Sequence, residues 1–143
     1  MTVAGILATK GREVVTTQPH RTVSEVAAML CDKGIGAIVV TGADGQVLGI
    51  ISERDIVRAA ARHGAAALDH AVSRHMTAKV ITTDERATLD TLMEVMTGGR
   101  FRHVPVVENN RLVGLVSIGD VVKHHVADIE TEQRALKDYI ATA

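Results

Sequence analysis

The sequence predicts a mixed α+β protein (α/β in some classifications) that consists of two tandem copies of one unit, packed with pseudo-twofold symmetry. The segment that starts at Val14 recurs 66 residues later at Val80, and a second motif that starts at Gly49 recurs at Gly114. Each copy alternates short β-branched runs with stretches of helical periodicity. With 143 residues, 46% of them apolar, the chain is long enough for two small units that share one core.

The first half of each copy is predicted to be a strand followed by a helix. Residues 14–17 and 80–83 are short β-branched runs, which favour strands. Thr22 then opens an amphipathic stretch, and Glu25 stands at the capping-box position behind it. The second copy has the same apolar stripe after Thr88, and its helix is expected to end at residues 98–99.

The second half of each copy is predicted to be a hairpin followed by a helix. Buried strands are expected over 37–40 and 104–107, with partner strands over 48–51 and 113–116. The intervening turns are rich in Gly, Asp and Asn, as hairpin turns usually are. The resulting boundaries are 10–64 for repeat one, 65–75 for a linker, 76–125 for repeat two and 126–143 for a C-terminal helical extension.

Composition and charge exclude several classes of function. A formal net charge of −1 disagrees with the basic excess of proteins that bind the phosphate backbone of nucleic acids. No apolar run approaches the roughly 18–20 residues of a membrane helix, and the first residues lack the marks of a secretion signal. The single cysteine, Cys31, agrees with a reducing compartment. We therefore expect a cytoplasmic protein without nucleic-acid or membrane partners.

A seven-residue pattern occurs once in each copy, at 49–55 and 114–120. It reads glycine, two apolar residues, serine, two variable residues and aspartate. Ser52 and Asp55, like Ser117 and Asp120, have the spacing of a helix cap, in which both side chains meet free backbone N–H groups. The same helix N-terminus is also suited to an anion, and its carboxylate could accept hydrogen bonds from ribose hydroxyls. Capping and ligand binding both remain open for this motif.

Basic residues near the motif favour a nucleotide. Arg100, Arg102 and His103 precede the buried strand of copy two, and Lys33 lies near the equivalent point of copy one. Since the chain has only two aromatic residues, an adenine ring would have to lie between aliphatic side chains. The candidates are Val15, Ile35, Ile81 and Val104.

These motifs resemble a pair of CBS domains, the cystathionine-β-synthase-type tandem also called a Bateman module. The resemblance covers about residues 10–125 and is carried by both Ser–Asp motifs and by the strands IGAIVV and RFRHVPVV. The chain is further similar to short stand-alone bacterial CBS proteins. The family implies two clefts between the repeats that often hold adenosine nucleotides: AMP, ADP, ATP, NAD or S-adenosylmethionine.

The resemblance also implies roles for individual residues. Asp55 and Asp120 would hold ribose hydroxyls, and Ser52 and Ser117 would face ribose or phosphate. Phosphate would meet Arg102 and His103 in copy two, and Arg54 in copy one, where that basic pair is missing. The base pocket would be lined by Val15, Ile35, Gly36, Ile81 and Val116, and Ile51 and Val104 are also predicted to be nucleotide-binding residues.

The predicted function is a regulatory module without catalysis, whose bound ligand is AMP or, alternatively, NAD(H), ATP or ADP. A structural or adaptor homodimer with empty clefts is the alternative. No cofactor or metal is expected, because His63, His70 and His75 lack ligand spacing and Cys31 is expected to be a small buried residue. An apolar stripe from Val122 to Ile140 predicts a C-terminal helix that contributes to a homodimer. The regulated protein is unknown.

Overall fold

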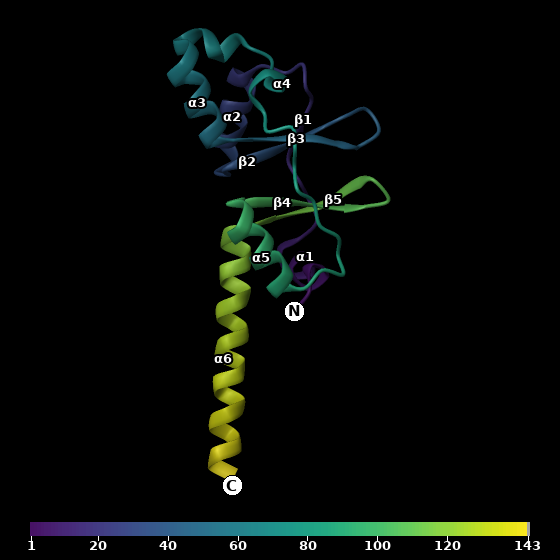
Figure 1. Ribbon diagram of the computed structural model, residues 1–143, viewed down its shortest axis with the longest axis vertical. Coiled ribbons are helices and arrows are strands. Elements are labelled where there is room, and N and C mark those ends of the chain that lie inside the picture. Colours follow the sequence, from purple (N-terminus) through teal and green to yellow (C-terminus); the bar gives the residue numbers. More distant parts are fainter. Residues whose placement is uncertain (143) are drawn as a thin grey trace.

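The computed structural model describes residues 1–142, which form two small sheets flanked by helices, with one long helix projecting from the body (Figure 1). The helices are α1 (Val3–Lys10), α2 (Val23–Lys33), α3 (Glu53–His63), the 3-10 helix η1 (Gly64–Asp69), α4 (Val72–His75), α5 (Leu89–Gly99) and α6 (Ile118–Thr142). The strands are β1 (Thr16–Thr17), β2 (Ala37–Thr41), β3 (Val47–Ser52), β4 (His103–Glu108) and β5 (Arg111–Ser117). The predicted α+β class is confirmed.

The two repeats have equivalent hairpins, but a third strand is added to the hairpin in repeat one alone. In repeat one, β1 runs parallel to β2, which pairs antiparallel with β3; in repeat two, β4 and β5 form a two-stranded antiparallel sheet. The strand expected over 80–83 is wrong, because that segment makes one isolated bridge, between Thr83 and Val106. Its pairing stops there because Asp84 begins a turn, accepting a hydrogen bond from the N–H of Arg86 at 2.8 Å.

Local signals set the ends of the first helices as predicted. Thr22 accepts a hydrogen bond from the N–H of Glu25, and Gly34 takes the left-handed conformation that ends α2. In repeat two, Thr88 caps α5 in the same way. α5 ends at Gly99, as expected, and Arg100 rather than a glycine takes the left-handed conformation after it, with φ 59°.

Each repeat begins with a short helix that was not predicted. Val3, Ile6 and Leu7 of α1 are buried in the core of repeat two, among residues such as Leu92 and Val116. Val72 of α4 is correspondingly buried in the core of repeat one. The segment expected to be a plain linker therefore contains η1 and α4, and the two repeats exchange their first helices.

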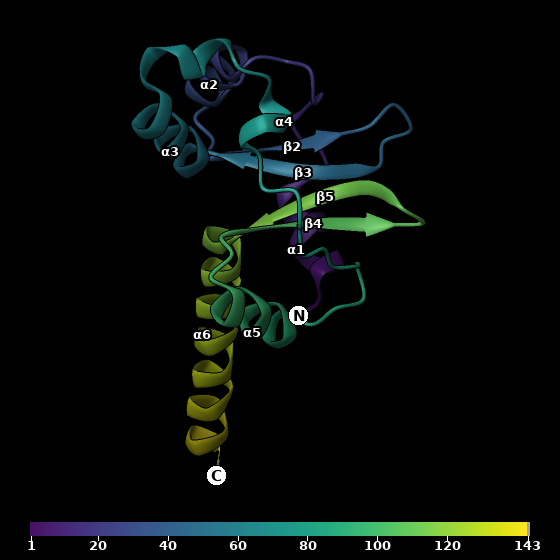
Figure 2. The same cartoon turned by 45° about the horizontal axis from the view of Figure 1, so that its top comes forward.

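A third apolar cluster joins the two sheets, which face each other in Figure 2. Ala37, Val39 and Ile50 of repeat one pack against Val80, Leu112 and Leu115 from the second half of the chain. The hairpins β2–β3 and β4–β5 consequently lie against each other. The Ser–Asp motifs are at one end of these hairpins and the turns at the other (Figure 2).

The C-terminal helix is one continuous element. The boundary expected at residue 125 falls inside α6, which runs from Ile118 to Thr142 without a break. Val121 and His124 are buried, whereas the predicted apolar stripe is exposed. The exposed stripe comprises Val122, Val126, Ile129, Leu136 and Ile140.

Candidate functional site

Ser52 and Asp55 form a complete capping box at the start of α3. The Oδ2 atom of Asp55 accepts hydrogen bonds from the backbone N–H and the hydroxyl of Ser52, at 2.9 and 3.0 Å. The N–H of Asp55 in turn lies 3.3 Å from the hydroxyl oxygen of Ser52. The motif is therefore a helix cap, and its use as a binding site would have to be compatible with this role.

Ser117 and Asp120 repeat this geometry at the start of α6. Oδ2 of Asp120 accepts from the backbone N–H and the hydroxyl of Ser117, at 2.8 and 2.9 Å. The N–H of Asp120 lies 3.2 Å from the hydroxyl oxygen of Ser117. The near-identical distances show that the duplicated sequence motif produces the same local structure twice.

A segment from the start of a repeat reaches each aspartate. Lys10, the last residue of α1, places Nζ 2.6 Å from Oδ2 of Asp120 and 2.7 Å from the carbonyl of Leu115. Thr77, just after α4, donates its hydroxyl to Oδ1 of Asp55 at 3.4 Å. Neither contact could be predicted from the sequence, because both depend on the exchange of the first helices.

The two motifs consequently differ in charge. Burial by itself would raise the pKa of Asp120, but hydrogen bonds from Lys10 and Ser117 outweigh it and hold this pKa below its ordinary value. At Asp55, the hydroxyl of Thr77 takes the place that the ammonium group of Lys10 has at Asp120. The two Ser–Asp motifs therefore differ in their surroundings, with a cation beside Asp120 and a hydroxyl beside Asp55.

His103 lies at the junction of the two repeats. It pairs with Ser117 across the β4–β5 ladder, and its Cε1 atom lies 3.7 Å from the position that a Cβ on Gly36 would take. Gly36 is the equivalent of His103 in repeat one, and a Cβ at Gly36 would be in ordinary van der Waals contact with the imidazole. The two predicted site residues therefore meet at one place.

The surroundings of His103 disfavour its charged form. Burial, followed by the positive charges of Lys10 and Arg102, lowers its pKa from 6.5, although Asp120 and Glu53 act in the opposite direction. At neutral pH the ring is a neutral hydrogen-bonding group and not a second cation. The other residue of the predicted basic pair, Arg102, is exposed.

The predicted aliphatic residues divide into two groups. Ile51, Val104 and Val116 are fully buried in the cores. None of the three residues has solvent-exposed surface in this structure, and their part in a nucleotide site stays a prediction. Val15, Ile35 and Gly36 are half-buried, Ile81 is 45% exposed and Arg54 is exposed, so these residues remain accessible.

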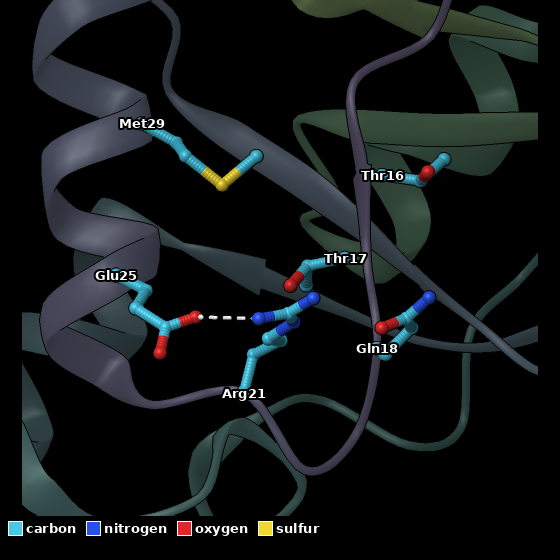
Figure 3. Close-up of a pocket in the computed structure, with 6 residues that line it drawn as sticks. All are labelled: Thr16, Thr17, Gln18, Arg21, Glu25 and Met29. Atoms are coloured by element: carbon cyan, nitrogen blue, oxygen red, sulfur yellow. Dashed lines mark ion pairs between the residues drawn. The ribbon is translucent and has the colours of Figure 1, made fainter.

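Two surface hollows lie away from the motifs. One, of about 310 Å³, lies between the β1 segment and α2; there Arg21 and Glu25 form an ion pair at 3.6 Å (Figure 3). The other, of about 390 Å³, lies at the turn end of the hairpins and includes Arg12, Asp44 and Arg111. Neither is lined by the predicted site residues.

Other chemistry-bearing side chains give a mixed result. Cys31 is exposed, so the expectation of a buried cysteine is wrong: it falls on the outer face of α2. Within residues 1–142, no group of three or more His, Cys, Asp or Glu side chains already has the geometry of a metal site as it stands. Among the same residues, none of the helices combines the length and apolarity that crossing a bilayer requires.

Comparison with known proteins identifies the family. The sequence model of the CBS domain matches residues 6–62 and 72–127. The chain belongs to the CBS-domain family. The two matches begin within α1 and at α4, so each CBS domain includes the short helix that packs into the other.

Individual CBS proteins resemble this chain over most of its length. The CBS-domain containing protein ATU1752 from Agrobacterium tumefaciens is 54% identical, with a TM-score of 0.84, covering 87% of this chain and 99% of that one. The mitochondrial CBS domain-containing protein CBSX3 of Arabidopsis thaliana is 32% identical over 97% of this chain and 71% of its own length. The CBS domain pair of protein MJ0100, crystallised with 5′-methylthioadenosine and S-adenosyl-L-methionine, is 26% identical, with a TM-score of 0.80 over 90% of this chain and 98% of that one.

Proposed function

We propose that this CBS pair is a regulatory module that binds an adenosine nucleotide at its Ser–Asp motifs and has no catalysis of its own. AMP is the proposed ligand, with NAD(H), ATP and ADP as alternatives. The adenosine compounds bound by the similar pair of MJ0100 support this class of ligand. The proposal places the module in the cytoplasm, where its occupancy would report on the energy or redox state.

The arrangement around Asp120 is the observation that carries the proposal. The carboxylate uses Oδ2 for its cap and for Lys10, while no hydrogen bond within residues 1–142 reaches its Oδ1 atom. That oxygen could accept a ribose hydroxyl without breaking the cap. The ammonium group of Lys10 and the start of α6 would both favour a phosphate nearby.

An adaptor role is the second candidate, and a specific observation favours it. Both serines and both aspartates already have hydrogen-bond partners inside their caps, and both hollows lie elsewhere. In an adaptor, the clefts between the repeats would hold no ligand. The protein would then regulate its partner by protein contact alone.

The module is further proposed to work as a homodimer. Val57 of α3 and Val122 of α6 occupy equivalent positions in the two repeats and are 66% and 55% exposed. The stripe on α6 extends this apolar surface along a helix that projects from the body (Figure 1). A second copy would bury both parts of the surface.

Thermal unfolding against a ligand panel tests the function directly. The test ligands are AMP, ATP, NAD and S-adenosylmethionine, and GMP is the matched control for the base. A ligand at 100 times its dissociation constant should add about 2.7 kcal/mol to the free energy of unfolding. A rise with AMP but not with GMP supports the nucleotide reading; no shift with any ligand favours the adaptor.

A further inference from the structure

The rings of His63, His70 and His75, which lack the spacing of metal ligands in the sequence, gather at one surface of repeat one. His63 ends α3, His70 follows η1, and His75 ends α4. The ring centroids of His70 lie 5.1 Å from those of both His63 and His75, and the remaining pair is 5.4 Å apart. Folding therefore produces a cluster that sequence spacing did not indicate.

The backbone that holds these rings is anchored independently of them. The N–H of Val23 donates to the carbonyl of His70 at 3.0 Å, and the N–H of Val72 donates to that of Arg21 at 2.7 Å. Val72 is itself fully buried in the core. The segment from His70 to His75 is thus fixed against the start of α2, so the cluster does not depend on attraction between the rings.

The rings are held in the form that binds metals. Nδ1 of His70 and Nε2 of His75 lie 2.8 Å apart in a hydrogen bond, which requires one nitrogen to be an unprotonated acceptor. A neutral imidazole offers such a lone pair to a metal ion.

The cluster is close to a coordination shell without already being one. Two nitrogen ligands at about 2.0–2.1 Å from a tetrahedral ion are about 3.3 Å apart, which is wider than the present 2.8 Å. A small rotation of the rings would exchange the hydrogen bond for two coordinate bonds. His63 is exposed and its partners are half-buried, so an ion could enter from solvent.

We propose that His63, His70 and His75 form a binding site for one divalent transition ion of the zinc class. Three imidazoles with water in the fourth position suit Zn²⁺, Co²⁺ or Ni²⁺ and do not suit the hard ions Mg²⁺ and Ca²⁺. Arg62 and Arg74 contribute positive charge near the rings and Asp69 negative charge, so the site is expected to be moderate in affinity. It does not depend on nucleotide binding.

Equilibrium dialysis of the untagged full chain with Zn²⁺ tests the site, and Co²⁺ gives an independent visible spectrum. The expected result is one ion per chain, with binding weakened roughly a hundredfold in His75→Gln, since a lost ligand should cost at least as much as a lost outer-shell partner. His63→Gln serves as the second variant if His75→Gln does not fold. His20→Gln removes an exposed histidine elsewhere and should bind as the wild type does.

Three results would overturn the site. They are no uptake by the wild type, less than one ion per chain, or equal uptake by the wild type and both cluster variants. In the last case Asp128→Asn would locate the ion, because His124 and Asp128 form a possible ligand pair on α6. Uptake of Mg²⁺ comparable to that of Zn²⁺ would contradict the proposed ligand chemistry.

Discussion

The Nζ atom of Lys10 lies 2.6 Å from Oδ2 of Asp120, although 110 residues separate them in the chain. The pair ties the end of α1 to the start of α6 and places a cation at one of the two Ser–Asp motifs. The side chains of Lys10 and Asp120 are 33% and 21% exposed, so the pair is expected to contribute no more than about 1 kcal/mol to stability. Its larger effect would be on a ligand.

Lys10→Gln should distinguish phosphate binding from ribose binding. We expect the affinity for AMP to fall about tenfold, because the substitution removes a charge-assisted hydrogen bond, while the affinity for adenosine stays unchanged. Isothermal titration with the two ligands measures this difference. Equal losses for both ligands would mean that Lys10 acts only by positioning Asp120.

Asp120→Ala should separate the two roles of the motif. If the carboxylate holds ribose hydroxyls, nucleotide affinity falls about a hundredfold. If it is only a cap, the substitution costs about 1 kcal/mol of folding stability and leaves the affinity as it was. Asp55→Ala is the matched variant for the other cleft, and unchanged affinity in both would refute the ribose-holding role.

His103 should make stability depend on pH. Because its pKa is lowered in the folded state, the unfolded chain binds more protons as pH falls through 6.5, and the folded state loses stability. His70 and His75 act in the same direction. Urea unfolding at pH 7.5 and 5.5 should show a smaller loss in His103→Gln than in the wild type, at most about 1.4 kcal/mol per pH unit for one proton. If His103→Gln and the wild type lose the same free energy of unfolding, groups other than His103 cause the pH dependence.

Removal of residues after Lys123 should abolish the proposed homodimer. The truncation deletes most of the exposed stripe on α6 and leaves the buried Val121 in place. Light scattering should then report a lower apparent mass. Val57→Asp tests the equivalent position on α3, and a dimer that survives both changes would place the interface elsewhere.

Gly49→Ala and Gly114→Ala should both destabilise the protein, the first more strongly. A Cβ at Gly49 would lie 2.7 Å from the carbonyl oxygen of Thr77, whereas one at Gly114 would meet the movable side chain of Leu7 at 2.7 Å. We expect a cost of about 1–3 kcal/mol in chemical unfolding. Gly98→Ala, in open space within α5, is the control and should stabilise by about 0.5–1 kcal/mol. A small loss at Gly49 would show that the Thr77 segment can shift.

The sequence by itself determined the features that depend on short-range contacts. The repeat is visible in the sequence itself. Interactions between residues three or four positions apart, which spacing reveals, set the caps at Ser52 and Ser117 and the end of α2 at Gly34. The family resemblance follows from the same motifs. The hairpins were predictable too, because their turns and alternating strands are local.

Only the tertiary structure decided how the two repeats are joined. No local pattern indicates that Leu7 packs on Gly114, that Lys10 reaches Asp120, or that His103 lies beside Gly36. The same holds for the three histidines, whose rings meet only after α4 docks on the start of α2. The contacts of Leu7, Lys10 and His103 join residues distant in the chain, and the short first helices that bury their apolar side chains in the core of the opposite repeat hold the two repeats together.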